Sequence, residues 1–260
     1  MSRKVRERLA YREKQVERRD KMLIHDFKTE RATIEEVFDQ ATLLVLYRFL
    51  NSGVINEVNG VISSGKEARV YWAKNKQGED LAVKIYLTSS ADFKRGMIKY
   101  IEGDPRFKGV KRDTKSLISA WAQKEFKNLE QAANAKVRVP KPVAVDSNVL
   151  IMEFIGKAGV SAPSLKEQPP ENAEKVYNQL LRYMERLYRK AELVHGDLSE
   201  YNLIIWKGNL VMFDMSQSVP ITHPLAQFLL NRDITNVNRF FSRLGVKVLS
   251  NEEVYRKVAG

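Results

Sequence analysis

The sequence predicts an α+β fold in two parts, with β-strands in the first part and mainly α-helices in the second. Short β-rich runs separated by turn residues occupy residues 57–86 and 137–155. Apolar residues recur at helical spacing later in the chain, at 171–192 and after 223. The strand-like run Met152–Ile155 ends at Gly156, as expected of a hinge between two lobes.

The composition is that of a globular protein, with 43% hydrophobic residues in a chain of 260. The absence of cysteine excludes disulfides and thiolate zinc sites, and three scattered histidines argue against a histidine metal site. No run approaches the roughly 18 apolar residues that span a membrane. The basic N-terminus shows no secretory signal, so we expect a cytoplasmic protein without membrane contact.

The formal net charge of +12 favours a phosphate-rich partner such as nucleic acid, although a surface rich in charged pairs would give the same excess. Residues 1–31 are densely charged and predict a basic arm or a solvated helix, which either binds RNA or binds nothing. Residues 32–54 follow as a predicted helix that packs on the larger body. Thr33 and Glu36 form a capping box at its start, and Ser52-Gly53 end it.

The strand-rich segment 57–86 contains a small-residue turn, Ser63-Ser64-Gly65-Lys66, which would let backbone N–H groups approach a phosphate. Taken alone this turn is also what an ordinary hairpin needs, and it is not a Walker loop. Lys84 lies in the apolar run LAVKIY (81–86), where a buried ammonium requires a partner. In the protein-kinase pattern V-A-I-K such a lysine holds phosphates and pairs with a glutamate on a helix.

Residues 88–117 are polar and basic with little periodicity, which predicts a long mobile insertion in the first lobe. A helix follows, and it offers two candidate partners for Lys84. Glu125 adjoins the apolar face of this helix, and Glu130 is the competing candidate. The first lobe is expected to span 55–153 and the second 154–260. At the boundary, main-chain groups of Glu153 and Ile155 beside Met152 would pair with an adenine edge.

The stretch VHGDLSEYNLIIWKGNLVMFD (194–214) holds the densest chemistry in the chain. Two apolar runs, 203–206 and 210–213, flank a turn at Lys207-Gly208-Asn209 and predict a hairpin. This hairpin would bring Asn202 and Asp214 to one end, beside Asp197. Amide and carboxylate oxygens are the ligands that magnesium prefers, with phosphates and waters completing the shell.

The same stretch is close to the protein-kinase catalytic loop H-R-D-L-x-x-x-N and its metal aspartate. Gly196 stands where that loop has arginine, and Asp214-Met215-Ser216 stands where kinases have Asp-Phe-Gly. Little chain follows Asp214 for an activation segment and a helical peptide-binding lobe, and no A-P-E motif follows.

Taken in order, SSGKEARVYWA, LAVKIY, LIMEFIG, VHGDLSEYNLII and VMFDMSQ resemble the RIO family of atypical protein kinases, over about residues 35 to 250. The Ser-Gly-Lys-Glu-Ala turn points to the first RIO subfamily, of archaeal type. Members of that subfamily more often have threonine at the position of Ser64. The resemblance implies a reduced bilobal kinase fold, with a β-rich N-lobe and a mainly helical C-lobe, lacking the activation loop and peptide-docking helices.

The resemblance also implies functions and residue roles. It implies ATP with Mg²⁺, or Mn²⁺ in its place, serine autophosphorylation, ATPase activity, and a role in maturation of the small ribosomal subunit with its rRNA. A monomer is expected. Asp197 would orient the nucleophile, and Asp214 would itself accept a phosphoryl group in the ATPase branch. The metal ligands would be Asn202 and Asp214, and the nucleotide contacts would be Ser63, Ser64, Gly65, Lys66, Lys84, Glu125, Met152, Glu153 and Ile155.

Two other functional classes stay open from the residues alone. A small-molecule kinase of the aminoglycoside or choline type shares H-G-D-x-x-x-x-N, but it should carry an acidic substrate lobe. An RNA-binding pseudokinase would bind RNA in a salt-sensitive way without hydrolysing ATP. The autophosphorylated serine also stays open, with Ser89, Ser90 and Ser116 as candidates.

Overall fold

A computed structural model describes residues 38–87 and 91–260 of the chain, and for residues 91–95 it describes the helix without the side chains. The chain divides into two compact units, residues 1–52 and 53–260. Each unit is described by itself.

The described part of the first unit is helix α3 (Gln40–Ser52). At the start of this helix, the carboxylate of Asp39 accepts a hydrogen bond from the amide of Thr42 at 2.8 Å and caps the first turn. The predicted capping box at Thr33 and Glu36 and the basic arm 1–31 lie outside the described residues. The packing of residues 32–54 on the larger unit stays a prediction.

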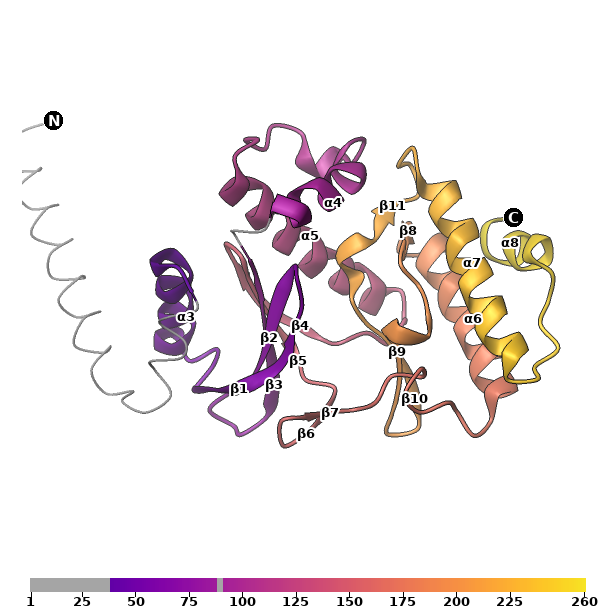
Figure 1. The fold of residues 1–260 in the computed structure, drawn as a ribbon, viewed down its shortest axis with the longest axis horizontal. Coiled ribbons are helices and arrows are strands. Elements are labelled where there is room, and N and C mark those ends of the chain that lie inside the picture. The colour runs from indigo at the N-terminus through magenta and orange to yellow at the C-terminus, as the bar shows by residue number, and fades with distance from the viewer. Residues whose placement is uncertain (1–37, 88–90) are drawn as a thin grey trace, which may run out of the picture. The chain divides into compact units, whose positions relative to one another are not determined.

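The second unit begins with an antiparallel sheet whose strands run in the order β1-β2-β3-β5-β4 (Figure 1). The strands are β1 (Glu57–Ser64), β2 (Ala68–Lys74), β3 (Asp80–Tyr86), β4 (Pro142–Asp146) and β5 (Val149–Glu153). The turn at Ser63–Lys66 joins β1 to β2 as a hairpin, and a second hairpin joins β2 to β3. Central strand β3 pairs on both edges, so Lys84 lies opposite Val70 on one side and Leu150 on the other.

The expectation of an irregular excursion at 88–117 was wrong. Helix α4 (Ala91–Ile101) and a short 3-10 helix, η1 (Pro105–Phe107), occupy most of it, and α5 (Thr114–Asn134) already begins at Thr114. Met97 and Tyr100 are buried one turn apart on α4, and the Tyr100 ring meets Trp121 of α5 edge to face at 6.0 Å. These contacts reach across the sequence, so local periodicity could not reveal the helix.

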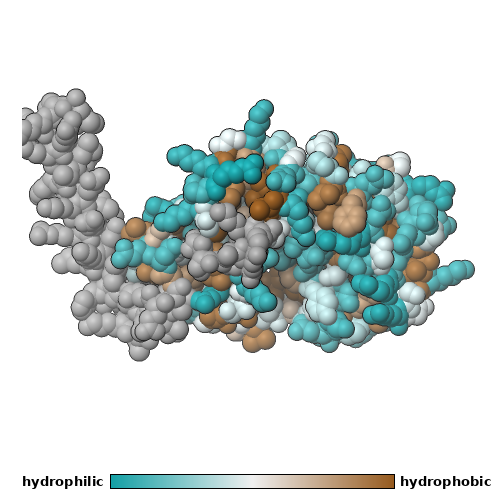
Figure 2. Space-filling view, turned by 45° about the horizontal axis from the view of Figure 1, so that its top comes forward, coloured by the Kyte–Doolittle hydropathy of each residue, from teal (hydrophilic) through white to brown (hydrophobic). Residues whose placement is uncertain are grey.

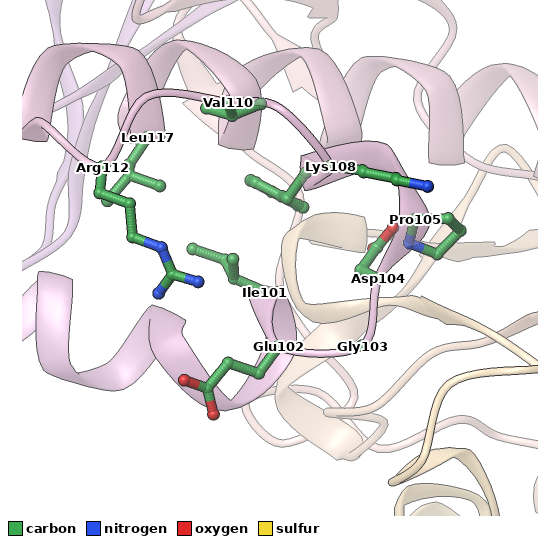
Figure 3. A pocket seen from close by; sticks show the side chains of 10 residues that line it. Ile101, Glu102, Gly103, Asp104, Pro105, Lys108, Val110, Arg112 and Leu117 are labelled. Atoms are coloured by element: carbon green, nitrogen blue, oxygen red, sulfur yellow. The ribbon is translucent and has the colours of Figure 1, made fainter.

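The connection between α4 and α5 surrounds a pocket of about 380 Å³ (Figure 3). Apolar side chains of Ile101, Val110 and Leu117 line it, together with the charged side chains of Glu102 and Arg112. The Asp104 carboxylate also belongs to this lining.

The rest of the second unit is mainly helical, with short strands between helices. Its elements are β6 (Gly156–Lys157), β7 (Val160–Ser161), α6 (Ala173–Arg189), β8 (Leu193–Val194), η2 (Glu200–Asn202), β9 (Leu203–Trp206), β10 (Asn209–Met212), η3 (Met215–Gln217), β11 (Val219–Pro220), α7 (Ala226–Arg243) and α8 (Asn251–Ala259). Figure 1 shows α6, α7 and α8 side by side, and residues of all three contact one another. The predicted hairpin is confirmed as β9–β10.

One large apolar core runs through this unit, from Tyr86 and Trp121 to Phe241 and Val258. On the face drawn in Figure 2, hydrophilic residues cover most of the coloured surface and hydrophobic residues form small patches. Within the described ranges, no helix combines the length and the apolar character needed to cross a bilayer.

Candidate active site

Lys84 of β3 is held between two carboxylates. Its Nζ donates to Glu125 Oε1 of α5 at 2.9 Å and to Asp214 Oδ1 at 3.0 Å. Burial opposes the charge on this side chain, but the two carboxylates outweigh burial and raise the pKa of Lys84. The predicted pairing with Glu125 is therefore confirmed, whereas the competing candidate Glu130 is exposed at the far side of the helix turn.

Glu125 is almost fully buried, with 1% of its surface exposed. One carboxylate oxygen accepts from Lys84, and the other accepts from the hydroxyl of Tyr86. Burial raises the pKa of Glu125, and the charge of Lys84 counteracts that effect. Tyr86 was not singled out from the sequence, although its position two residues after Lys84 places it on the same face of β3.

Asp214 follows β10 in a left-handed backbone conformation, with φ 57° and ψ 67°. Its Oδ1 accepts from Lys84 and, at 2.7 Å, from the hydroxyl of Ser216. Burial alone would raise the pKa of Asp214, but Lys84 and Ser216 outweigh it and lower the pKa to about 2. Asp214 is thus a carboxylate at neutral pH.

Asn202 and Asp214 lie at the same end of the β9–β10 hairpin, as the sequence predicts. Leu203 pairs with Met212, and the amide of Phe213 donates to Asn202 O at 3.1 Å. The side-chain nitrogen of Asn202 donates to the Asp197 carbonyl at 2.8 Å and to its carboxylate at 3.3 Å. Burial, together with the charge of Asp214, raises the pKa of Asp197.

Asp233 of α7 binds the backbone of the loop that carries Asp197. Asp233 is 1% exposed, and its two carboxylate oxygens accept from the amides of Gly196 at 2.8 Å and Leu198 at 2.9 Å. Burial raises the pKa of Asp233 to about 7, against the effect of these two donors. Both amides flank Asp197, so this contact sets the loop geometry.

The backbone conformation and a close neighbour explain why residue 196 is glycine. Gly196 has φ +80°, and a Cβ there would lie 2.9 Å from the carbonyl oxygen of Gln217. A side chain is therefore strained at this position both by the backbone conformation and by contact. The neighbouring His195 is buried, and burial lowers its pKa to about 4, so it is neutral near pH 7.

Lys84, Glu125 and Asp214 border a cavity of about 570 Å³ between the sheet and the β9–β10 hairpin. The predicted nucleotide residues that line it are Ser63, Gly65, Lys66, Lys84, Glu125, Met152, Glu153 and Ile155. The predicted metal ligand Asp214 lines it as well. Ser64, Asp197 and Asn202 do not line the cavity itself. In the turn, Gly65 N donates to Ala68 O at 3.0 Å.

At the hinge, the side chain of Glu153 is engaged by Arg138, whose two terminal nitrogens reach its carboxylate at 2.5 and 2.8 Å. The Glu153 amide donates to Lys141 O, and the Ile155 carbonyl accepts from Ala162 N. The Glu153 side chain is therefore a structural element rather than a free acid or base.

Comparison with known proteins decides the family. The model described as "RIO domain" matches residues 69–254, which is more than half of the chain. The chain belongs to the RIO family. The RIO-type serine/threonine-protein kinase Rio1 of Haloferax volcanii is 46% identical over 90% of this chain and 78% of its own length. The Rio1 of Methanocaldococcus jannaschii is 39% identical over 95% of this chain and 83% of its own length. Both relatives are archaeal RIO1 proteins, in agreement with the subfamily that the motifs indicate.

Human serine/threonine-protein kinase RIO1 is 42% identical over 89% of this chain, which spans 41% of the human protein. Among solved structures, the RIO fold matches the Rio2 kinase–ADP/Mg²⁺–phosphoaspartate complex of Chaetomium thermophilum with a TM-score of 0.61 and 20% identity. The match covers 83% of this chain and 65% of that one. At that identity the likeness establishes the fold, which is the kinase-like α+β fold expected from the sequence.

One charged residue that lines the cavity, Glu67, was not predicted from the sequence. Glu67 lies in the same turn as Gly65 and lines the cavity. Burial raises the pKa of Glu67, and the charge of Asp214 adds to this while Lys84 opposes it. Its place inside the G-K-E-A turn was the available signal, but nothing local distinguishes it from a solvated glutamate.

Proposed function

We propose that this RIO1-family chain binds ATP with Mg²⁺ in the cavity and transfers the γ-phosphoryl group to a serine or threonine hydroxyl. The observation that carries the proposal is the meeting of Lys84, Glu125 and Asp214 within hydrogen-bond distance, although they come from three separate segments. Relatives that align over nearly the whole chain are named serine/threonine-protein kinases, which supports the same reaction class.

The nucleotide would contact both lobes. Lys84, whose charge is secured by two carboxylates, would hold phosphate oxygens, and Ser63 to Lys66 would cover the triphosphate with backbone N–H groups. Because the Glu153 amide and the Ile155 carbonyl are engaged within the protein, an adenine edge would use the Glu153 carbonyl and the Ile155 amide. Met152 would lie against the base.

Asn202 and Asp214 suit Mg²⁺ in their chemistry. The nitrogen of Asn202 is engaged by Asp197, which leaves the oxygen for a cation, and Asp214 supplies a carboxylate with a pKa of about 2. A bound Mg²⁺ would neutralise charge on the phosphates. Asp197 would orient the acceptor hydroxyl and take its proton, aided by a raised pKa.

We further propose autophosphorylation, ATPase activity and action in maturation of the small ribosomal subunit, in the cytoplasm. The ATPase branch would have the Asp214 carboxylate attack the γ-phosphorus with departure of ADP, after which water hydrolyses the acyl phosphate. The Rio2 structure named as a phosphoaspartate complex supports this branch by likeness of fold alone. The net charge of +12 supports an rRNA-containing partner.

Labelled ATP tests the proposal. With γ-labelled ATP and magnesium, we expect label on serine or on a carboxylate, together with free phosphate. Asp197→Ala should remove most turnover while ATP still binds, and Asp214→Ala should abolish any hydroxylamine-sensitive label. Near-normal turnover of Asp197→Ala would reject its role. Acid-stable label on serine alone in the wild type would reject the carboxylate branch.

The same assay separates the other classes. A small-molecule kinase would transfer label to an added aminoglycoside or to choline, and a pseudokinase would give no label and no free phosphate. Precursor small ribosomal subunits, added in parallel, would report whether turnover responds to the proposed partner.

A further inference from the structure

The segment that follows Asp214 is held by the buried side of α5. Lys124 Nζ donates to Ser216 O at 2.7 Å, and Asn128 Nδ2 donates to Met215 O at 2.8 Å and to Ser218 O at 3.2 Å. Three backbone carbonyls, two within η3 and one at the residue that follows it, therefore accept hydrogen bonds from side chains of one helix. This is the same helix that carries Glu125.

Both donor side chains are removed from water. Lys124 is 1% exposed and Asn128 0%. Lys124 lies between the carbonyl of Ser216 and the face of the Trp121 ring, with its Nζ 4.2 Å from the ring centroid. An ammonium or amine buried in this way costs free energy that an apolar side chain of similar volume would not. The fold tolerates that cost at a position one residue before Glu125.

A second row of contacts backs the first. Arg106, from η1, donates to Asn128 Oδ1 at 2.6 Å and is itself held by Asp104 at 2.7 Å. Tyr100 of α4 donates to the side chain of Gln217. Helix α4 and the α4–α5 connection, whose pocket is drawn in Figure 3, thus add to the support of η3 that α5 provides.

Asp214 needs such support because of its backbone. Its left-handed φ of 57° is uncommon for a residue with a side chain, and it persists only where the flanking chain fixes it. The residues flanking it on the C-terminal side are those whose carbonyls Lys124 and Asn128 hold. The carboxylates of Asp214 and Glu125 both accept from Lys84. Helix α5 therefore contributes Glu125 to this network directly and also holds the segment that follows Asp214.

We propose that Lys124 and Asn128 are positioning residues: they fix the η3 backbone and thereby the direction in which Asp214 presents its carboxylate to Mg²⁺·nucleotide. The inference rests on the proposed role of Asp214 as a magnesium ligand. Neither residue touches the nucleotide or the metal in this scheme. A side chain that orients a metal ligand changes metal affinity or activity by about 10- to 100-fold when it is removed.

Lys124→Met and Asn128→Leu test the inference in the full chain, with Lys127→Met as the matched control. Lys127 is an exposed lysine on the same helix. We expect the first two variants to need about tenfold more Mg²⁺ for half-maximal ATP turnover. Their thermal stabilisation by ADP alone should equal that of the wild type, while the extra stabilisation from adding Mg²⁺ to ADP should shrink. The control should match the wild type in both measurements.

The outcomes distinguish this inference from the proposed function. If Asp214→Ala loses the Mg²⁺ effect while Lys124→Met and Asn128→Leu keep it at wild-type strength, the positioning roles are wrong. If Asp214→Ala itself keeps the Mg²⁺ effect, the proposed metal role fails, and the inference fails with it. Circular-dichroism melting identifies a variant that does not fold, and the decision then rests on the other of the two. A purely structural role would lower the melting temperature without changing the Mg²⁺ dependence.

Discussion

Lys84 shows at the residue scale how a buried charge is made stable and useful. Its side chain is 10% exposed, and its ammonium nitrogen lies within 3.0 Å of a carboxylate oxygen of both Glu125 and Asp214. Two carboxylates against one ammonium leave an excess of negative charge, which favours a further cation at the cavity. The apolar run around Lys84 predicted that it needs a partner, and the helix pattern predicted Glu125. Tyr86 donates to the other oxygen of Glu125, and Ser216 donates to the same Asp214 oxygen as Lys84. Neither residue carries a sequence pattern that separates it from core or turn residues.

Lys84→Met should leave a folded protein with little activity. Removal of a preorganised positive group at a phosphoryl-transfer site costs about 10²- to 10³-fold in kcat. The buried Glu125 would lose the charge that opposes the effect of burial, so its pKa would rise further. Steady-state kinetics measures the first effect. Lys127→Met serves as the control, and activity within a few-fold of the wild type in Lys84→Met would contradict the role given to this ammonium.

At the scale of elements, α7 holds the loop that carries Asp197. The buried carboxylate of Asp233 accepts from two amides of the loop, and Arg232 and Asn236 donate to two of its carbonyls. Both oxygens of Asp233 are used by the amides of Gly196 and Leu198. Asp233→Asn has one acceptor oxygen, so one buried amide loses its partner at a cost of about 1–3 kcal/mol. We expect urea unfolding to show that loss and kcat to fall, since Asp197 lies between the two amides. Gln227→Ala, which changes an exposed side chain of α7, should alter neither. An unchanged kcat in a destabilised Asp233→Asn would make the contact purely structural.

The sequence was most informative where structure is local. Turn residues and alternating apolar runs predicted the five sheet strands and the β9–β10 hairpin, and the hairpin then predicted that Asn202 and Asp214 meet. It failed at α4, whose buried side chains pack on Trp121 rather than on their own neighbours. Asp233 was also missed, because an aspartate within a helical pattern looks solvent-exposed until the loop that it binds is known.

At the scale of the whole molecule, a buried lysine should make stability depend on pH. Burial, with the charge of Arg106, lowers the pKa of Lys124 from 10.5 to about 7. Between these values the unfolded chain binds more protons than the folded one, so the free energy of unfolding rises with pH there. Below about pH 7 the penalty for burying the charge is fully present. Urea unfolding at several pH values should show a shallower rise for Lys124→Met than for the wild type. Equal slopes would contradict the lowered pKa.

The charge of the whole chain predicts a salt-sensitive interaction with RNA. Counterion release makes the logarithm of the binding constant fall linearly with the logarithm of salt concentration. Residues 1–31 concentrate arginine and lysine, so a chain lacking them should bind precursor rRNA with a smaller slope while keeping its ATP turnover. Fluorescence anisotropy at increasing salt measures the slope. The same slope with and without residues 1–31 would assign the interaction to the rest of the chain.

The central claim is that Asn202 and Asp214 bind one Mg²⁺ ion on the same nucleotide that Lys84 contacts. Calorimetric titration of ADP with and without Mg²⁺ tests this claim most directly. In the wild type, Mg²⁺ should strengthen ADP binding. Asn202→Leu and Asp214→Ala should each lose most of that gain and still bind ADP without the metal, and Lys127→Met should keep it. Full retention of the Mg²⁺ gain in both site variants would contradict the account.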